Sequence, residues 1–127
     1  HGPTARGDPV SGLALWPAVA VAGALGSMAR VTLAAWIGGA RGIALINLSG
    51  GLALGAMAGA GVDGDWMVVL GAGLLGAFTT FSTWMVDTVA LHDAGRSRTA
   101  VAKVLGQALL GLALAGLGLA TGAAIAG

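Results

Sequence analysis

The residues best suited to chemistry form one short run, Gly76 to Trp84, with the sequence Gly-Ala-Phe-Thr-Thr-Phe-Ser-Thr-Trp. The run lies inside an apolar stretch long enough to enter a membrane. Its hydroxyl side chains can bond back to the preceding turn and bend a helix, and nearby glycines weaken the same segment. We therefore expect a break near residues 76–80. The break would free backbone carbonyls that cannot face lipid, and a bound cation would satisfy them.

The aromatic residues of this run, Phe78, Phe81 and Trp84, recur at three-residue steps. This spacing places an aromatic stripe on one face of the segment. The stripe is either an ordinary lipid-facing or core surface, or a row of positive ring edges that attracts anions.

Polar residues also occur in the other apolar stretches. Arg30 either snorkels to the interface or supplies a fixed positive charge that concentrates anions. Asn47, close to Ser49, either bonds to a neighbouring helix or directs an amide donor into a pore. Asp87 either pairs with Arg30 or lies at the membrane interface.

The composition predicts which structural elements must position these residues. The chain has 127 residues, of which 57% are hydrophobic and 9% charged, whereas soluble domains carry about 25% charged residues. This predicts an all-α membrane protein. We expect a disordered polar tail at 1–11 and a single four-helix transmembrane domain at 12–127. The apolar stretches run over 13–37, 43–60, 67–91 and 100–125, and their short connectors predict antiparallel neighbours.

Glycines recur every fourth residue on two of these stretches, at Gly51, Gly55 and Gly59 and again at Gly118 and Gly122. Such stripes let helices approach closely in lipid, either within the chain or at a dimer face.

Basic residues gather around the first and third connectors, 38–42 and 92–98. They are Arg41, Arg96, Arg98 and Lys103. The positive-inside rule places these connectors in the cytoplasm and both termini outside.

Several function classes fit poorly. The chain has no cysteine, which excludes disulfides and thiolate sites. A proton-coupled exporter needs a central membrane carboxylate, and no acidic residue occupies such a position. His1 and His92 lie outside the apolar stretches and no acid–base pair is visible, so we do not expect an enzyme.

Three segments resemble, in order, the signatures of the bacterial CrcB/Fluc family of fluoride channels. They are Gly23–Arg30, Asn47–Gly50 and Gly76–Thr83. The resemblance implies two antiparallel subunits, with the third helix broken mid-membrane, that form two narrow fluoride pores around a structural sodium ion. It also implies a multi-pass protein of the bacterial inner (cell) membrane.

The resemblance also implies individual roles. The carbonyls of Gly76 and Thr79 would hold sodium. The fluoride pathway would comprise Asn47, Phe81, Ser82, Thr83, Trp84 and Arg30. Trp84 replaces a phenylalanine of the family pattern, and Gln107 and Gly111 occupy fourth-helix positions that often carry serine.

The resulting expectation is a fluoride-selective channel that exports fluoride passively from the cytoplasm. Its partners would be fluoride, lipid and a second similar subunit in opposite orientation, and no nucleic acid. The charge bias and the departures at Trp84 and Gly111 favour one half of an antiparallel heterodimer over a homodimer. The alternatives are a small dual-topology drug or cation exporter and a non-conducting partner subunit of a membrane complex.

Overall fold

The structure is a computed structural model that describes residues 12–127, where every regular element is a helix. The expected tail at 1–11 lies outside the described residues. The elements are α1 (Gly12–Ile37), α2 (Gly39–Gly59), α3 (Gly64–Trp66), the π-helical η1 (Met67–Leu75), α4 (Gly76–Phe78), α5 (Ser82–Asp93) and α6 (Ser97–Ala126). Four spans are long and apolar enough to cross a membrane, with α3 to α5 together forming the third, Gly64–Asp93. The predicted all-α architecture with four membrane-spanning helices is confirmed.

The helices extend further than the hydropathy pattern indicated. A single residue, Gly38, separates α1 from α2, and its φ of 83° is one that glycine adopts without strain. Arg41 therefore lies in the first turn of α2 instead of in a connector. Likewise α6 begins at Ser97, so Arg98 belongs to the helix.

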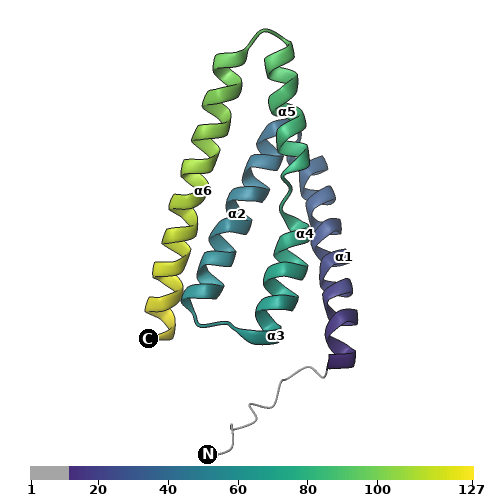
Figure 1. Ribbon diagram of the computed structural model, residues 1–127, viewed down its shortest axis with the longest axis vertical. Helices are drawn as coiled ribbons and strands as arrows, with labels where there is room; N and C mark the ends of the chain where they lie inside the picture. The colour runs from purple at the N-terminus through teal and green to yellow at the C-terminus, as the bar shows by residue number, and fades with distance from the viewer. Residues whose placement is uncertain (1–11) are drawn as a thin grey trace, which may run out of the picture.

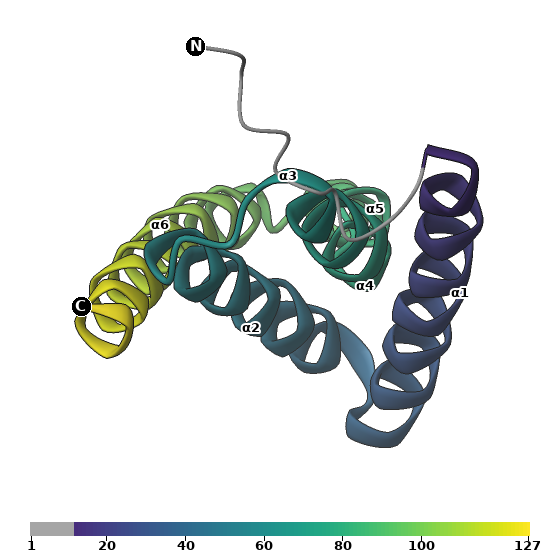
Figure 2. The same ribbon diagram turned by 90° about the horizontal axis from the view of Figure 1, so that it is seen from below.

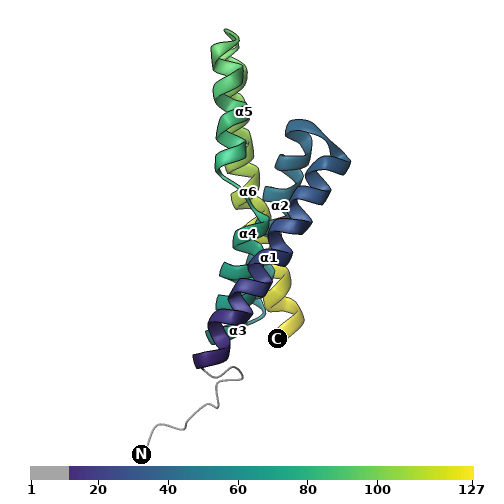
Figure 3. The same cartoon turned by 90° about the vertical axis from the view of Figure 1, so that its right-hand side faces the viewer.

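The first and third connectors lie at one end of the molecule. Figure 1 shows the start of α1 and the end of α6 at the lower end, and the α5–α6 connector at the upper end. In Figure 3 the turn between α1 and α2 also lies toward the upper end, apart from the α5–α6 connector. Neighbouring spans are therefore antiparallel, as the short connectors predict.

The glycine stripes pack α2 against α6 within the chain. A Cβ atom on Gly55 would collide with the carbonyl of Ala115, and one on Gly118 would collide with the carbonyl of Leu52. Gly59 and Gly122 make equivalent approaches to the opposite helix. Of the two interpretations of these stripes, the structure supports close packing inside one subunit.

On the other side of the third span lies α1, as Figure 2 shows. Gly26 of α1 lies against the backbone of Leu74 and Phe78, and Gly73 lies against Val19. The third span is thus held between α1 and the α2–α6 pair. Few side chains are fully buried, and Ile46 of α2 is the largest of them, at 1% exposed. The most deeply packed part of the fold is therefore directly beside Asn47, the next residue of α2.

Candidate functional site

The third span is interrupted where the hydroxyl-rich run lies. Thr79 is extended, with φ −78° and ψ 157°, and α5 starts only at Ser82. The span bends by 27°. The break predicted near residues 76–80 is confirmed, although it covers residues 79–81 and leaves Gly76 and Ala77 helical.

Asn47 of α2 fills the break with two hydrogen bonds. Its Nδ2 donates to the carbonyl of Thr80 and its Oδ1 accepts from the N–H of Thr80, both at 2.8 Å. In a continuous helix that N–H would bond to the carbonyl of Gly76. The side chain of Asn47 therefore replaces a helical turn and leaves the carbonyl of Gly76 without its usual donor.

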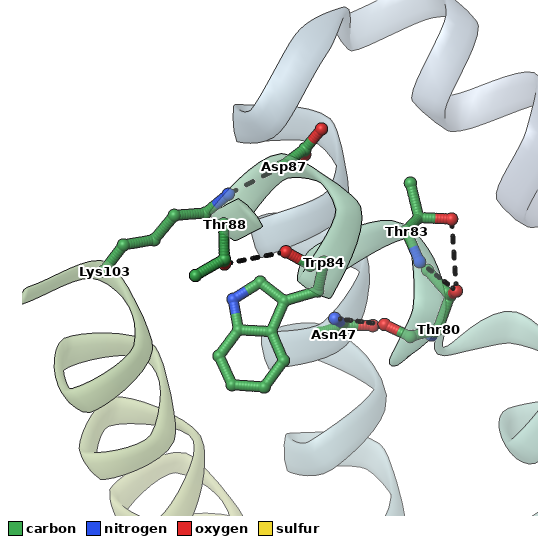
Figure 4. A network of polar contacts seen from close by, with 7 residues as sticks. All are labelled: Asn47, Thr80, Thr83, Trp84, Asp87, Thr88 and Lys103. Carbon is green, nitrogen blue, oxygen red and sulfur yellow. Dashed lines mark hydrogen bonds and ion pairs between the residues drawn. The ribbon is translucent and has the colours of Figure 1, made fainter. Parts of the chain in front are cut away.

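The hydroxyls of the run gather around Thr80, which is 7% exposed. Its Oγ1 donates to Oγ1 of Thr83 at 3.3 Å and lies 3.4 Å from Oγ of Ser82. The same oxygen accepts the N–H of Thr83 at 3.4 Å, as drawn in Figure 4. Thr80 thus caps the first turn of α5, whose N-terminal end carries a partial positive charge.

Arg30 reaches the break from α1. Its Nη1 donates to the carbonyl of Thr79 at 3.4 Å. It does not pair with Asp87, which instead lies 3.7 Å from Nζ of Lys103. Arg30 therefore places a positive charge at the break. Snorkelling would instead have drawn its guanidinium to the membrane interface.

The two residues whose carbonyls are expected to hold a cation line one pocket. Gly76 and Thr79 line a cavity of about 250 Å³ that also contacts Asn47 and Gly50. Within residues 12–127 no group of three His, Cys, Asp or Glu side chains could hold a metal, so a cation here would depend on carbonyl oxygens. The free carbonyl of Gly76 fits that role. Thr79 has a second lone pair beside the bond from Arg30, although the arginine charge opposes a cation.

The aromatic pair at the start of α5 is arranged edge to face. The rings of Phe81 and Trp84 lie 5.8 Å apart at 73°. Phe81 is 71% exposed, so the chain itself barely covers this ring. The indole N–H of Trp84 is buried and has no hydrogen-bond partner among the described residues, an arrangement that costs about 1–3 kcal/mol.

A second cavity lies on the other side of Asn47, between α2, α5 and α6. It measures about 290 Å³. Its lining residues are Asn47, Leu48, Trp84, Gln107, Ala108, Gly111 and Leu112. Trp84, Gln107 and Gly111, where the resemblance implies a departure from the usual residues, therefore line one cavity.

Comparison with known proteins places this site in a family. The model of the family described as "CrcB-like protein, Camphor Resistance (CrcB)" matches residues 17–119. The chain belongs to the CrcB-like protein family. The match spans all four membrane helices, and the break, Arg30 and Asn47 lie within it.

Three relatives show what this CrcB-like chain is similar to. The "Fluoride-specific ion channel FluC 1" of Symbiobacterium thermophilum is 44% identical over 84% of this chain and 96% of its own length. "Fluoride-specific ion channel FluC 2" of the same organism is 40% identical over 79% of this chain and 90% of its own. "Fluoride-specific ion channel FluC 2" of Mycobacterium tuberculosis is 35% identical over 84% of this chain and 89% of its own.

The structure brings the predicted site residues of the CrcB-like chain to the break or next to it. Thr79 and Phe81 lie in the break, and Gly76, Asn47 and Trp84 line the cavities beside it. Ser82 and Thr83 follow in the first turn of α5, and Arg30 donates to the carbonyl of Thr79. Sequence reasoning missed Thr80 as the residue that Asn47 holds, because adjacent threonines look alike in sequence. It also missed the pairing of Lys103 with Asp87.

Proposed function

We propose that this CrcB-like chain conducts fluoride passively across the bacterial cell membrane. Its relatives are named fluoride-specific ion channels. The observation that carries the proposal is the break held by Asn47 and Thr80. The break brings hydroxyl and amide donors together along the third span. A membrane helix of aliphatic residues has no such donors.

Fluoride gives up its water only where other donors replace that water. The hydroxyls of Ser82 and Thr83 and the second amide hydrogen of Asn47 are suitable donors. The N-terminal end of α5 and Arg30 add positive potential, and the edge of Phe81 is also positive. These groups stabilise an anion, and conduction requires no chemical reaction from any of them.

Export follows from acid–base chemistry. Hydrogen fluoride enters from acidic surroundings as a neutral molecule and dissociates at cytoplasmic pH. A selective leak then lets the anion move out down its gradient. Passive conduction is therefore enough to lower cytoplasmic fluoride, and no coupled ion is needed.

A second, antiparallel subunit would complete the pathway. Phe81, Ser82 and Thr83 are exposed in the single chain, and polar side chains at membrane depth usually face a protein interior or a water-filled cavity. A partner covering this face would also bring a second set of Gly76 and Thr79 carbonyls toward the first. A structural sodium ion between them would satisfy the carbonyls that the break releases.

The charge bias favours an unequal partner. Arg41, Arg96 and Arg98 lie at one end of the molecule, which orients every copy the same way. One organism holds relatives named FluC 1 and FluC 2, so such proteins occur side by side. Reporters fused to the C-terminus should signal from the outside only. Equal signals from both sides would instead support a homodimer.

Growth on fluoride tests the function in cells. A bacterium lacking its own fluoride exporter should regain growth at millimolar fluoride when it expresses this chain, with a similar subunit if needed. Asn47→Leu should abolish the rescue. No rescue by membrane-inserted wild-type chain, alone or paired, would argue against conduction.

A non-conducting partner subunit is the second candidate. Trp84 and Gly111 favour it, because they alter the cavity beside Asn47. Such a subunit would support conduction by its partner even when its own Phe81 is replaced. An exporter is less favoured, because Asp87 lies near the end of its span and already pairs with Lys103.

A further inference from the structure

An apolar groove lies between α5 and α6, at the end of the molecule where these helices are connected. It consists of two adjoining cavities of about 320 and 480 Å³, which share Ser97, Val101 and Leu105 of α6. Its other apolar lining residues are Val89 of α5 and Ala100, Ala102 and Val104 of α6. Val101 and Leu105 are each 57% exposed, so the chain leaves this apolar surface uncovered.

The other helices of the described chain do not cover the groove. All of its lining residues belong to α5 or α6. In Figure 3 the connector between these two helices lies well beyond the turn between α1 and α2. Whatever covers the groove in a membrane must therefore come from outside the described residues.

The polar side chains of the groove are concentrated at one end. Arg98 and His92 lie there beside Ser97, and Nδ1 of His92 is 2.9 Å from the Ser97 hydroxyl. Thr88 lies one helical turn before His92, but its hydroxyl already donates to the carbonyl of Trp84. From Ser97 to Leu105 the groove follows α6 for about 12 Å. This length is close to one leaflet of the hydrocarbon core, about 15 Å.

The polar end of the groove carries positive charge. Arg96 and Arg98 are both exposed there, and Asp93 is the one carboxylate of the connector region. Asp87 lies further along α5 and pairs with Lys103. The positive-inside rule places this end at the cytoplasmic face, where anionic lipids make the membrane surface negative. A molecule with an anionic head and an apolar tail therefore complements both parts of the groove.

We propose that this groove binds an anionic phospholipid of the cytoplasmic leaflet. One acyl chain lies along Val101 and Leu105, and the phosphate lies beside Arg96 and Arg98. The apolar walls hold the chain without regard to the headgroup, whereas the arginines select a negative headgroup. The site is separate from the break at Thr79 to Phe81, so it does not depend on the proposed conduction of fluoride.

Native mass spectrometry with defined lipids tests the site. Protein in mild detergent is titrated with dioleoyl phosphatidylglycerol and, in parallel, with dioleoyl phosphatidylcholine. We expect phosphatidylglycerol to bind saturably and at least about fivefold more tightly, the effect of one arginine near a lipid surface. Glycerol phosphate carries the same phosphate without the acyl chains and should not compete. Equal affinity for the two lipids, or displacement by glycerol phosphate, would overturn the proposal.

A pair of arginine variants distinguishes this groove from general surface charge. Arg98→Gln should weaken phosphatidylglycerol binding about fivefold and leave phosphatidylcholine binding unchanged. Arg41→Gln is the matched control, because Arg41 is also exposed but does not line the groove. Equal losses in the two variants would contradict a site at Arg98.

Filling the groove tests the position of the acyl chain. Val101→Trp should weaken the binding of both lipids about tenfold, because the indole would occupy the space of several methylene groups. Val21→Trp on α1 is the control, since Val21 is similarly exposed, at 61%. Unchanged lipid binding in Val101→Trp would overturn the proposal. The same spectra report the oligomeric state, and conversion of dimers to monomers by Val101→Trp would instead assign the groove to a contact between two copies of the chain.

Discussion

Asn47 and Thr80 are joined by two hydrogen bonds of 2.8 Å across 33 residues of sequence. One asparagine side chain thereby satisfies both backbone groups of a residue that the third span leaves outside its helices. The break therefore has a side chain, Asn47, that satisfies its unpaired backbone groups. The stability of the break and the proposed conduction pathway both depend on this side chain.

Replacing Asn47 by leucine should destabilise the folded protein by about 2–4 kcal/mol, because Thr80 would keep a buried N–H and carbonyl without partners. Unfolding in detergent monitored by helical circular dichroism measures this loss. Ser49→Ala is the control, since Ser49 bonds only within its own helix, to Ile46 at 3.0 Å. Equal stability of Asn47→Leu and Ser49→Ala would contradict this role for Asn47.

Two glycines of α6, two residues apart, should respond oppositely to alanine. At Gly118 the added Cβ would meet the carbonyl of Leu52 and push α2 away from α6, at about 1–3 kcal/mol. At Gly116 the Cβ meets nothing within 4 Å, so a gain of up to about 1 kcal/mol in helix propensity remains. Thermal unfolding of both variants checks the difference, and equal midpoints would refute the α2–α6 packing.

The ion pair between Asp87 and Lys103 should be asymmetric in its energetics. Lys103 is 12% exposed and Asp87 is 34% exposed. Asp87→Asn strands a buried ammonium, whereas Lys103→Met leaves a carboxylate that water can reach. We expect Asp87→Asn to be the more destabilising by about 1–2 kcal/mol. A double-mutant cycle measures the coupling, and the reverse order would contradict the burial argument.

The four spans were predictable from sequence because apolar length is a local property, and the break was predictable because glycines and hydroxyls weaken the segment that contains them. The pairing of residues that lie far apart in the sequence was not predictable. Whether Asn47 faces Thr80 or a pore depends on how α2 is rotated against the third span. The glycine stripes likewise indicate that some helix approaches closely, but only the assembled fold identifies it as α6.

Sodium should stabilise the assembled protein if it binds the carbonyls of Gly76 and Thr79. A ligand that binds only the folded state raises stability in proportion to the logarithm of its concentration. The unfolding midpoint should therefore rise with sodium and not with equal N-methylglucamine at constant ionic strength. Matching curves for the two cations would count against a sodium site.

Fluoride release from liposomes tests the central claim most directly. Vesicles loaded with potassium fluoride or, in parallel, with potassium chloride, and carrying the chain alone or with a similar subunit, are treated with a potassium ionophore while an electrode records the released halide. We predict rapid fluoride release with chloride retained. Phe81→Ile should slow release at least about tenfold, roughly 1.4 kcal/mol in the barrier, without changing the unfolding midpoint. No release from folded protein, alone or paired, or equal release of chloride, would contradict the account.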